Sequence, residues 1–384
     1  MKNRIYLDHA ATTTVSKAVL DAMLPFFTEC PGNASAVYAT GREARKAVEE
    51  ARKQAAAAIG AEPREILFTG GGSESDNQAV KGTAFALKEK GRHIITTAVE
   101  HPAVLNTCGW LEKQGFKVTY LMPDREGRID PEQVEQAVRK DTVLISVMAA
   151  NNEIGTIEPV AEIGRIAREK GVTFHIDAVQ AVGAMPVDVN AWNADMLSLS
   201  AHKFNGPKGV GALYVRRGTR IHSLIHGGEQ ERGLRAGTEN TAGIVGLGRA
   251  IEIAVAAQKK NAEKTRRLRD RLTEGILASV ADAYLNGPKE NRLPNNCSVR
   301  FGGIDGEALL LRLDLAGIAG SAGSACTAGS QEISHVLKAV GLSDEEAKSS
   351  LRLTVGPENT EQEIDEAVAA VKDIVADLRR MFRG

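Results

Sequence analysis

A lysine at the end of an apolar stretch is the first candidate for chemistry in this sequence. Lys203 follows the apolar residues 196–199, lies beside Ser200 and His202, and precedes a Gly- and Pro-containing turn. A lysine that is desolvated in such a place loses its proton more easily and can form a Schiff base with an aldehyde. The alternative is a lysine at a strand end that extends to solvent. The choice depends on which other residues meet there.

A glycine-rich turn at residues 69–75 is a candidate for binding phosphate. It reads Thr-Gly-Gly-Gly-Ser-Glu-Ser between a strand-like and a helical stretch. Gly72 lets the backbone approach an anion, the helix N-terminus offers free N–H groups, and Ser73 adds a hydroxyl. An ordinary capped turn has the same composition. The spacing matches neither a P-loop nor a dinucleotide fingerprint.

Three further polar positions follow apolar strand-like stretches. Asp177 can hold a ring nitrogen protonated, as pyridoxal enzymes require, or it can cap a following helix. His101 can stack on a flat ring or move protons, or it can be structural. Asn151 and Asn152 can hydrogen-bond a phenolic oxygen or a carboxylate, or they can form a turn.

Two arginines and one cysteine complete the candidates. Arg352 lies in an apolar strand-like stretch and needs an anion, either a substrate carboxylate or a structural partner. Arg235 and Thr238 lie in a charged loop that either contacts a phosphate or is solvated. Cys326 lies among small residues at 320–330. That composition favours a mobile loop with an exposed, nucleophilic thiol over a tightly packed segment.

The elements that must position these residues alternate between strand and helix. This alternation predicts a mainly parallel sheet with helices on both faces, and ligands bind at the carboxyl ends of such strands. The pair of strands around the lysine adds an antiparallel strand. The predicted strands cover residues 66–69, 93–97, 117–122, 142–149 and 173–176, and the predicted helices cover 42–59, 76–90, 102–114, 131–140 and 160–170.

The ends of the chain carry separate predictions. Residues 8–14 are expected to cap a helix over 17–27. A long helix over 241–280 is expected to connect the sheet to a second α/β unit, with the domain boundary inside it. The second unit is predicted to contain strands at 297–301 and 351–355 and helices at 306–316 and 360–381.

Composition excludes several classes of protein. The 384 residues include 48 Lys and Arg and 49 Asp and Glu, which gives no support for nucleic acid or anionic membrane as the main partner. Residues 1–8 lack the apolar core of a signal peptide, so we expect none, and the sequence has no apolar run of about 18 residues. The four cysteines are scattered and show no zinc spacing, so we expect no metal and a reducing, cytoplasmic location.

Together the candidates supply the parts of a pyridoxal phosphate site, and the motifs that carry them resemble one family. Almost from end to end, the sequence resembles the class I cysteine desulfurases of the NifS/IscS type. The matching motifs are Tyr6–Thr13, Glu100-His101-Pro102, Asn151-Asn152-Glu153, His175–Gln180, Ser200-Ala201-His202-Lys203, Arg235–Asn240 and Gly323–Thr327.

The resemblance implies a fold and an activity. The fold would be that of fold-type I pyridoxal phosphate-dependent transferases, similar to aspartate aminotransferase, with a mainly parallel seven-stranded sheet. The large domain would span 15–255, and the smaller α/β domain would comprise 1–14 and 256–384 with the cysteine loop. The activity would convert L-cysteine to L-alanine and leave a persulfide on Cys326. A homodimer would pass this sulfur to an iron–sulfur scaffold or a tRNA-thiolation enzyme.

The resemblance also implies residue roles. Lys203, Cys326 and His101 would be catalytic, with His101 stacking on the cofactor ring. Asp177 would pair with the ring nitrogen, Asn152 and Gln180 would lie near the ring oxygen, and Arg352 and Asn152 would bind the substrate. The phosphate would be bound by Gly72, Ser73, Ser200 and His202, joined by Thr238 of the partner subunit.

Alternative functions and departures from the family pattern remain. A selenocysteine lyase, or another pyridoxal phosphate-dependent lyase or aminotransferase, would use the same fold. A sulfur carrier without catalysis would not need Lys203. A nicotinamide dehydrogenase would need a dinucleotide-binding fingerprint, which this sequence lacks. His9 stands where the family usually has Asn, and residues 34–38 read Ala-Ser-Ala-Val-Tyr in place of the usual Pro-Ser-Ser and a following His. Both differences bear on substrate or acceptor preference.

Overall fold

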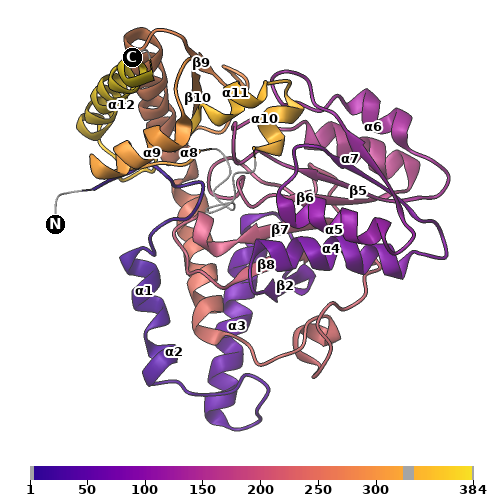
Figure 1. Cartoon of the computed structure of the whole chain (residues 1–384). Coiled ribbons are helices and arrows are strands. Elements are labelled where there is room, and N and C mark those ends of the chain that lie inside the picture. Colours follow the sequence, from indigo (N-terminus) through magenta and orange to yellow (C-terminus); the bar gives the residue numbers. More distant parts are fainter. Residues whose placement is uncertain (1–3, 323–332, 383–384) are drawn as a thin grey trace.

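A seven-stranded sheet forms the centre of the computed structural model, in which residues 4–322 and 333–382 are described (Figure 1). All neighbouring strands are parallel except the two pairs that β8 makes. This confirms the predicted mainly parallel sheet and the antiparallel strand that follows Lys203. The strand order is β2 (Ile66–Thr69), β8 (Gly211–Val215), β7 (Met196–Ser200), β6 (Thr173–Asp177), β5 (Thr142–Met148), β3 (His93–Thr97) and β4 (Lys117–Leu121).

Different helices cover the two faces of this sheet. Two helices pack on one face, and four helices with the first part of a fifth, longer helix pack on the other. Because successive side chains of a strand alternate between faces, Phe174 and Ile176 enter one core while His175 and Asp177 point to the opposite face. The first face carries α4 (Gly72–Ala86) and α5 (Pro102–Glu112), and the second carries α1 (Lys17–Met23), α3 (Ala39–Ala58), α6 (Pro131–Ala137), α7 (Val160–Lys170) and the first part of α8 (Thr241–Ser279).

Helix α8 runs from the large sheet to a smaller α/β unit (Figure 1). The small sheet is antiparallel in the order β12–β10–β9, and β1 near the N-terminus pairs with β11 beside it. The elements of this unit are β1 (Ile5–Tyr6), β9 (Ala283–Leu285), β10 (Asn296–Phe301), α9 (Gly306–Leu315), β11 (Ile318–Ala319), α10 (His335–Ala339), α11 (Asp344–Lys348), β12 (Ser350–Thr354) and α12 (Glu361–Phe382).

The small unit has a hydrophobic core of its own. This core combines Ile5 and Leu7 with apolar residues between 268 and 378. The grouping supports the predicted division into residues 15–255 and residues 1–14 with 256–384, which stays a prediction. Among the helices of the two described ranges, none has both the length and the apolar character that a membrane crossing needs.

Several element boundaries differ from those predicted. The helix expected over 17–27 is broken into α1 and α2 (Pro25–Thr28), because Pro25 has no N–H to continue the helix. Ser16 caps α1, so the predicted cap at residues 8–14 is wrong. Helix α4 begins at Gly72, four residues before the predicted start, and Gly71 precedes it with a φ of 149°. The short strands β1, β9 and β11 carry too few residues to show a pattern.

Candidate active site

A cavity of about 290 Å³ lies at the carboxyl edge of the large sheet. Thr238 of the same chain does not line it, and Cys326 lies outside the described residues. The cavity therefore brings together most of the predicted site residues but not all. Its lining includes Gly72, Ser73, His101, Asn152, Asp177, Gln180, Ser200, His202, Lys203 and Arg352.

The parallel strands explain why residues far apart in sequence meet here. Strand β6 ends at Asp177, and β7 ends at Ser200, directly before the 3-10 turn Ala201–Lys203. Strands β2, β3 and β5 end just before Gly72, His101 and Asn152. Because parallel strands point their carboxyl ends to one edge, the loops that follow them form a common pocket.

Lys203 is held inside the cavity by the N-terminal segment. Its ammonium Nζ donates hydrogen bonds to the carbonyl oxygens of Ala10 at 2.5 Å and Ala11 at 2.9 Å. The side chain therefore faces the pocket rather than extending to bulk solvent. Sequence reasoning missed Ala10 and Ala11, because a backbone carbonyl carries no residue-type signal.

Asp177 presents a buried carboxyl group. The residue is 5% exposed, and its Oδ1 accepts a hydrogen bond from the N–H of Val179 at 2.9 Å. Burial raises the pKa of this carboxyl, while the nearby His101 and Lys203 lower it. No helix lies between Asp177 and β7, so the alternative of a helix cap is wrong.

His101 has one ring nitrogen fixed by the fold. As the N-cap of α5, its Nδ1 accepts a hydrogen bond from the N–H of Ala103 at 3.1 Å. An accepting Nδ1 carries no proton, so the proton of the neutral ring lies on Nε2. Burial lowers the pKa of His101, which keeps the ring neutral. The structural role of His101 is therefore present, and its stacking on a cofactor ring stays a prediction.

The first turn of α4 and the end of β7 offer hydrogen-bond donors to an anion. No side chain caps α4 at Gly71. A Cβ added to Gly72 would lie 2.8 Å from Val179 Cγ2, so only glycine fits there. His202 contacts Thr12 Oγ1 through Nδ1 at 3.1 Å, and burial lowers its pKa to about 4. Free N–H groups, hydroxyls and a neutral imidazole suit a phosphate.

Arg352 has the structural partner that its sequence left open, and it also lines the cavity. Its side chain is 1% exposed, and its Nη2 donates to Asp8 Oδ1 at 2.8 Å. Its Nη1 donates to the carbonyl oxygen of Asn152 at 3.0 Å. A structural ion pair is thus present, and the same guanidinium lines the cavity.

Of the paired asparagines, one lines the cavity and the other does not, and Arg235 of the charged loop also lies outside the lining. Asn151 is a turn residue, because its Oδ1 accepts from the N–H groups of Glu153 and Ile154 at 2.8 and 3.0 Å. Asn152 lines the cavity. Arg235 Nε lies 3.0 Å from Glu74 Oε1, and its guanidinium is not part of the lining.

Sequence reasoning missed Asp76, a buried ionisable residue of the cavity. Asp76 lines it, is 1% exposed and lies on α4. The signal was its position four residues after Gly72, which puts both on the same face of a helix. The predicted helix start at residue 76 hid this relation.

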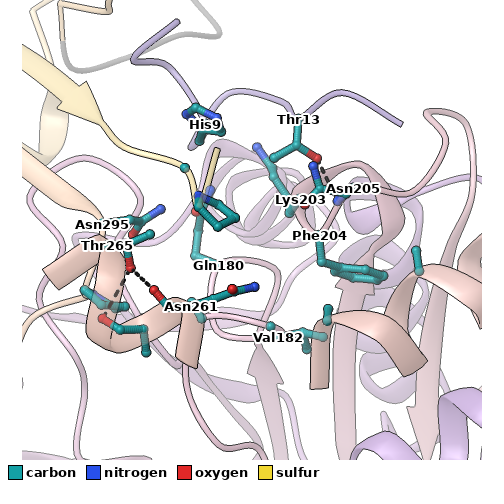
Figure 2. Close-up of a pocket in the computed structure, with 18 of the residues that line it drawn as sticks. His9, Thr13, Gln180, Val182, Lys203, Phe204, Asn205, Asn261, Thr265 and Asn295 are labelled. Carbon is teal, nitrogen blue, oxygen red and sulfur yellow. Dashed lines mark hydrogen bonds between the residues drawn. The ribbon is translucent and has the colours of Figure 1, made fainter. Parts of the chain in front are cut away.

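A second cavity of about 280 Å³ lies at the junction of the two units and shares Gln180 and Lys203 with the first (Figure 2). Apart from Lys203, its one titratable residue is His9. The His9 ring contacts the carbonyl oxygen of Thr354 at 2.9 Å and Glu358 Oε1 at 2.8 Å. The unusual His9 thus joins the N-terminal segment to the small unit, and the candidate chemistry lies in the first cavity.

Of the two cavities, the first has the donors and acceptors that pyridoxal phosphate requires. Asp177 offers a carboxylate for a ring nitrogen, His101 a flat neutral ring, and the first turn of α4 a cradle for phosphate. The amine of Lys203 lies in the same space. The residues present therefore fit this cofactor.

Comparisons with known proteins agree with this geometry. A family model described as aminotransferase class-V matches residues 5–367. The chain is 53% identical over 379 residues to a protein of Dictyoglomus turgidum named cysteine desulfurase IscS, covering 99% of this chain and 96% of that protein. It is also 53% identical over 377 residues to a protein of the same name from Methanosarcina thermophila, covering 98% and 93%.

Solved structures show the same similarity. A structure titled NifS-like protein superposes with a TM-score of 0.92 at 41% identity, covering 98% of this chain and 100% of that chain. A second, titled SspA in complex with cysteine, has a TM-score of 0.83 at 42% identity, covering 93% and 100%.

Proposed function

The chain belongs to the class-V aminotransferase family and is a pyridoxal phosphate-dependent cysteine desulfurase, and from that premise we propose that the 290 Å³ cavity is its active site. The supporting observation is that ten residues predicted for such a site line this one cavity. When bound, pyridoxal phosphate supplies an aldehyde that condenses with amines and a protonated ring that accepts electrons. The residues of the chain supply the remaining functions.

One group of side chains binds and orients the cofactor. The ionised carboxylate of Asp177 would keep the ring nitrogen protonated, and the neutral ring of His101 would face the cofactor ring. The amides of Asn152 and Gln180 would donate to the ring oxygen. The phosphate is bound by the first turn of α4 at Gly72 and Ser73, by Ser200 and His202, and by Thr238 of the partner subunit.

Lys203 is the amine that holds the cofactor and then moves the substrate's α-proton. The carbonyl oxygens of Ala10 and Ala11 fix the position of its Nζ in the cavity. A positioned general base contributes roughly 10²–10⁴-fold to such a step. Arg352 and Asn152 bind the carboxylate of L-cysteine, with Asp8 and the Asn152 carbonyl orienting the guanidinium.

Cys326 is the proposed sulfur acceptor. Its thiolate attacks the sulfur of the bound substrate, the carbon–sulfur bond breaks, and the carbon receives the electron pair and a proton. L-cysteine and the Cys326 thiol thus become L-alanine and a persulfide. Burial raises the pKa of Cys108 to about 12 and also raises that of Cys297, so neither thiol ionises readily.

Two substitutions test this function. Lys203→Ala and Cys326→Ala should each abolish L-alanine formation from L-cysteine, measured by chromatography of the free amino acid. Lys53→Ala, which changes an exposed lysine paired with Glu50, is the matched control and should retain full activity. Full-rate alanine formation by Cys326→Ala would exclude the persulfide step and favour a lyase or aminotransferase of the same fold. Parallel assays with selenocysteine measure selectivity.

We also propose a homodimer and a separate sulfur acceptor. Large apolar side chains are exposed on α1, on α2 and before α3, namely Leu20, Leu24, Phe27, Val37 and Tyr38. Such a patch is typical of a protein–protein interface. Light scattering should give twice the chain mass, and Phe27→Glu should lower it. The acceptor, an iron–sulfur scaffold or a tRNA-thiolation enzyme, is the protein that gains radioactive sulfur from the labelled persulfide.

A further inference from the structure

A row of buried polar side chains lies beneath the proposed active site, on the α4 side of the large sheet. Strand pairing places Ser146 beside His175 and Ser198 beside Asp177. Asp76 faces this row from α4, and all five residues are buried. Burying a polar group in an apolar core costs free energy unless the group is hydrogen-bonded, and burying a charge costs more than burying a neutral group.

The neutral ring of His175 has a hydrogen-bond partner for each of its two nitrogens. Its Nδ1 lies 2.8 Å from Ser146 Oγ, and its Nε2 lies 3.0 Å from Ser198 Oγ. A serine hydroxyl can donate or accept, so a ring with one proton meets both contacts. Burial lowers the pKa of His175 to about 3. This histidine therefore supplies no positive charge to its neighbours.

Within the described residues, the ion-pairing neighbour of Asp76 is His175, whose ring is neutral. Its Oδ1 lies 3.6 Å from His175 Nε2 and has no hydrogen-bond partner among the described residues. The charged groups that act on it most strongly are the carboxyls of Asp177 and Glu100, both of the same sign. Burial and these two carboxyls raise its pKa, whereas a hydrogen bond from Ser198 lowers it.

Asp177 lines the same cavity but has a different electrostatic environment. The N–H of Val179 and the ammonium of Lys203 act on it and favour its ionised form. Two carboxyl groups close together in a buried site do not both ionise, and one of them keeps a proton. The group whose ion-pairing neighbour is neutral is the one that keeps it, and that group is Asp76.

We propose that Asp76 is a positioning residue that keeps a proton beside Asp177, so that Asp177 alone is ionised and faces the cofactor's ring nitrogen. The proposal rests on the role of Asp177 proposed above. If Asp76 were ionised instead, the proton would be drawn to Asp177, which would then lack the negative charge that keeps the ring nitrogen protonated. Asp76 thus fixes which carboxyl of the pair carries the charge.

Infrared spectroscopy of the full-length protein tests the proton directly, without and with pyridoxal phosphate. Near neutral pH, the wild type labelled with ¹³C-aspartate should show a shifted C=O band of a protonated carboxyl group. Asp76→Asn should lack this band. Labelling aspartate alone separates it from the buried glutamates Glu100 and Glu158. An identical protonated-aspartate band in the wild type and in Asp76→Asn would overturn the proposal.

The pH dependence of cofactor affinity gives a second readout, measured by fluorescence titration of the cofactor-free protein. Asparagine imitates a neutral carboxyl group. The cofactor affinity of Asp76→Asn should therefore match that of the wild type within about twofold over the acidic pH range in which affinity falls, called here the acid limb. If Asp76 is ionised in the wild type, the same variant loses a like charge beside Asp177 and its acid limb shifts to lower pH, which contradicts the proposal.

Asp177→Asn separates the two proposals. It should lower cofactor affinity at least tenfold, because it removes the only proposed negative charge beside the ring nitrogen. Unchanged affinity would refute the proposed role of Asp177. The infrared band of Asp76 in the wild type would still report its own protonation state, so failure of one proposal is distinguishable from failure of the other.

Discussion

Among single residues, the N-terminal segment has an unexpected part in holding the two cations of the cavity. The carbonyl oxygens of Ala10 and Ala11 bind Lys203, and the carboxylate of Asp8 binds Arg352. Each contact spans more than 190 positions of sequence. The same segment reaches the small unit through His9. Residues 8–11 therefore orient the proposed amine and the proposed carboxylate receptor together.

Replacing Arg352 by lysine tests carboxylate binding. Lysine keeps the charge but loses the planar pair of donors, and a charge-assisted hydrogen bond contributes about 1.5–3 kcal/mol. Steady-state kinetics should show a KM for L-cysteine roughly 10–100-fold higher, with a smaller change in kcat. Arg312→Lys, at an exposed ion pair with Asp377, is the control and should leave KM unchanged. An unaltered KM in Arg352→Lys would remove Arg352 from the substrate site.

Glu158 gives a prediction about stability and pH. Its Oε2 accepts from the N–H of Ile129 at 2.9 Å, Oε1 is buried without a partner among the described residues, and burial raises its pKa to about 8. A carboxyl with a raised pKa favours the folded state while it is protonated. Its stabilising effect is present below the ordinary glutamate pKa and is lost as pH rises through about 8.

Glu158→Gln should therefore gain in free energy of unfolding relative to the wild type as pH rises from about 4.5 to 8. The glutamine carbonyl still accepts from Ile129, so the variant keeps that hydrogen bond. Urea unfolding at several pH values measures the difference. A constant difference over this range would mean that Glu158 titrates normally.

At the scale of elements, the start of α4 decides whether the cavity can take a phosphate. The helix begins at Gly72 because Gly71 adopts a backbone conformation that other residues rarely reach, with a φ of 149°. Gly72 then packs against Val179 in the loop after β6, so two strand ends are fixed at a close distance. The phosphate site is therefore a property of two elements in contact, not of the glycine run alone.

Gly72→Ala should lower affinity for pyridoxal phosphate at least tenfold. The added Cβ would lie 2.8 Å from Val179 Cγ2, which forces the first turn of α4 away from the cavity. Absorbance or fluorescence titration of the cofactor-free protein measures this. The matched control is Gly109→Ala inside α5, where the added Cβ meets nothing within 4 Å. That variant should bind the cofactor normally and be more stable by about 0.5–1 kcal/mol.

At the scale of the whole molecule, the cavity of one chain lacks a predicted residue. Thr238 follows Arg235, whose guanidinium is paired with Glu74 at the first turn of α4. Thr238 does not line the cavity of its own chain. The proposed dimer would supply it from the partner subunit.

Mixed dimers test whether Thr238 acts across subunits. Lys203→Ala should be inactive, and Thr238→Ala should be weak at limiting pyridoxal phosphate because it loses one hydrogen bond to the phosphate, about 1 kcal/mol. In a mixed dimer, the subunit with intact Lys203 receives an intact Thr238. Activity is divided by the number of subunits that keep Lys203. On this measure, co-purified mixed dimers should be more active than Thr238→Ala dimers, whereas Lys203→Ala dimers are inactive. Activity equal to that of Thr238→Ala would show that Thr238 acts within its own subunit.

The sequence alone determined the fold class and most of the proposed site. Strands alternating with helices predict a parallel sheet, and the carboxyl ends of parallel strands share one edge. Lys203, Asp177, His101 and Gly72 could therefore be grouped before any coordinates. The type and spacing of these residues also carried the resemblance to cysteine desulfurases. Local pattern suffices for such features because each depends on a strand end and the few residues after it.

Only the tertiary structure decided how those groups are held and charged. The carbonyls of Ala10 and Ala11, the pairing of Arg352 with Asp8 and the approach of Asp76 to His175 are contacts between distant segments. Backbone carbonyls have no sequence signature, and burial is a property of everything packed around a group. Protonation follows from burial and neighbouring charge. The sequence could name the ionisable residues, but their charge states depend on packing that only the folded chain creates.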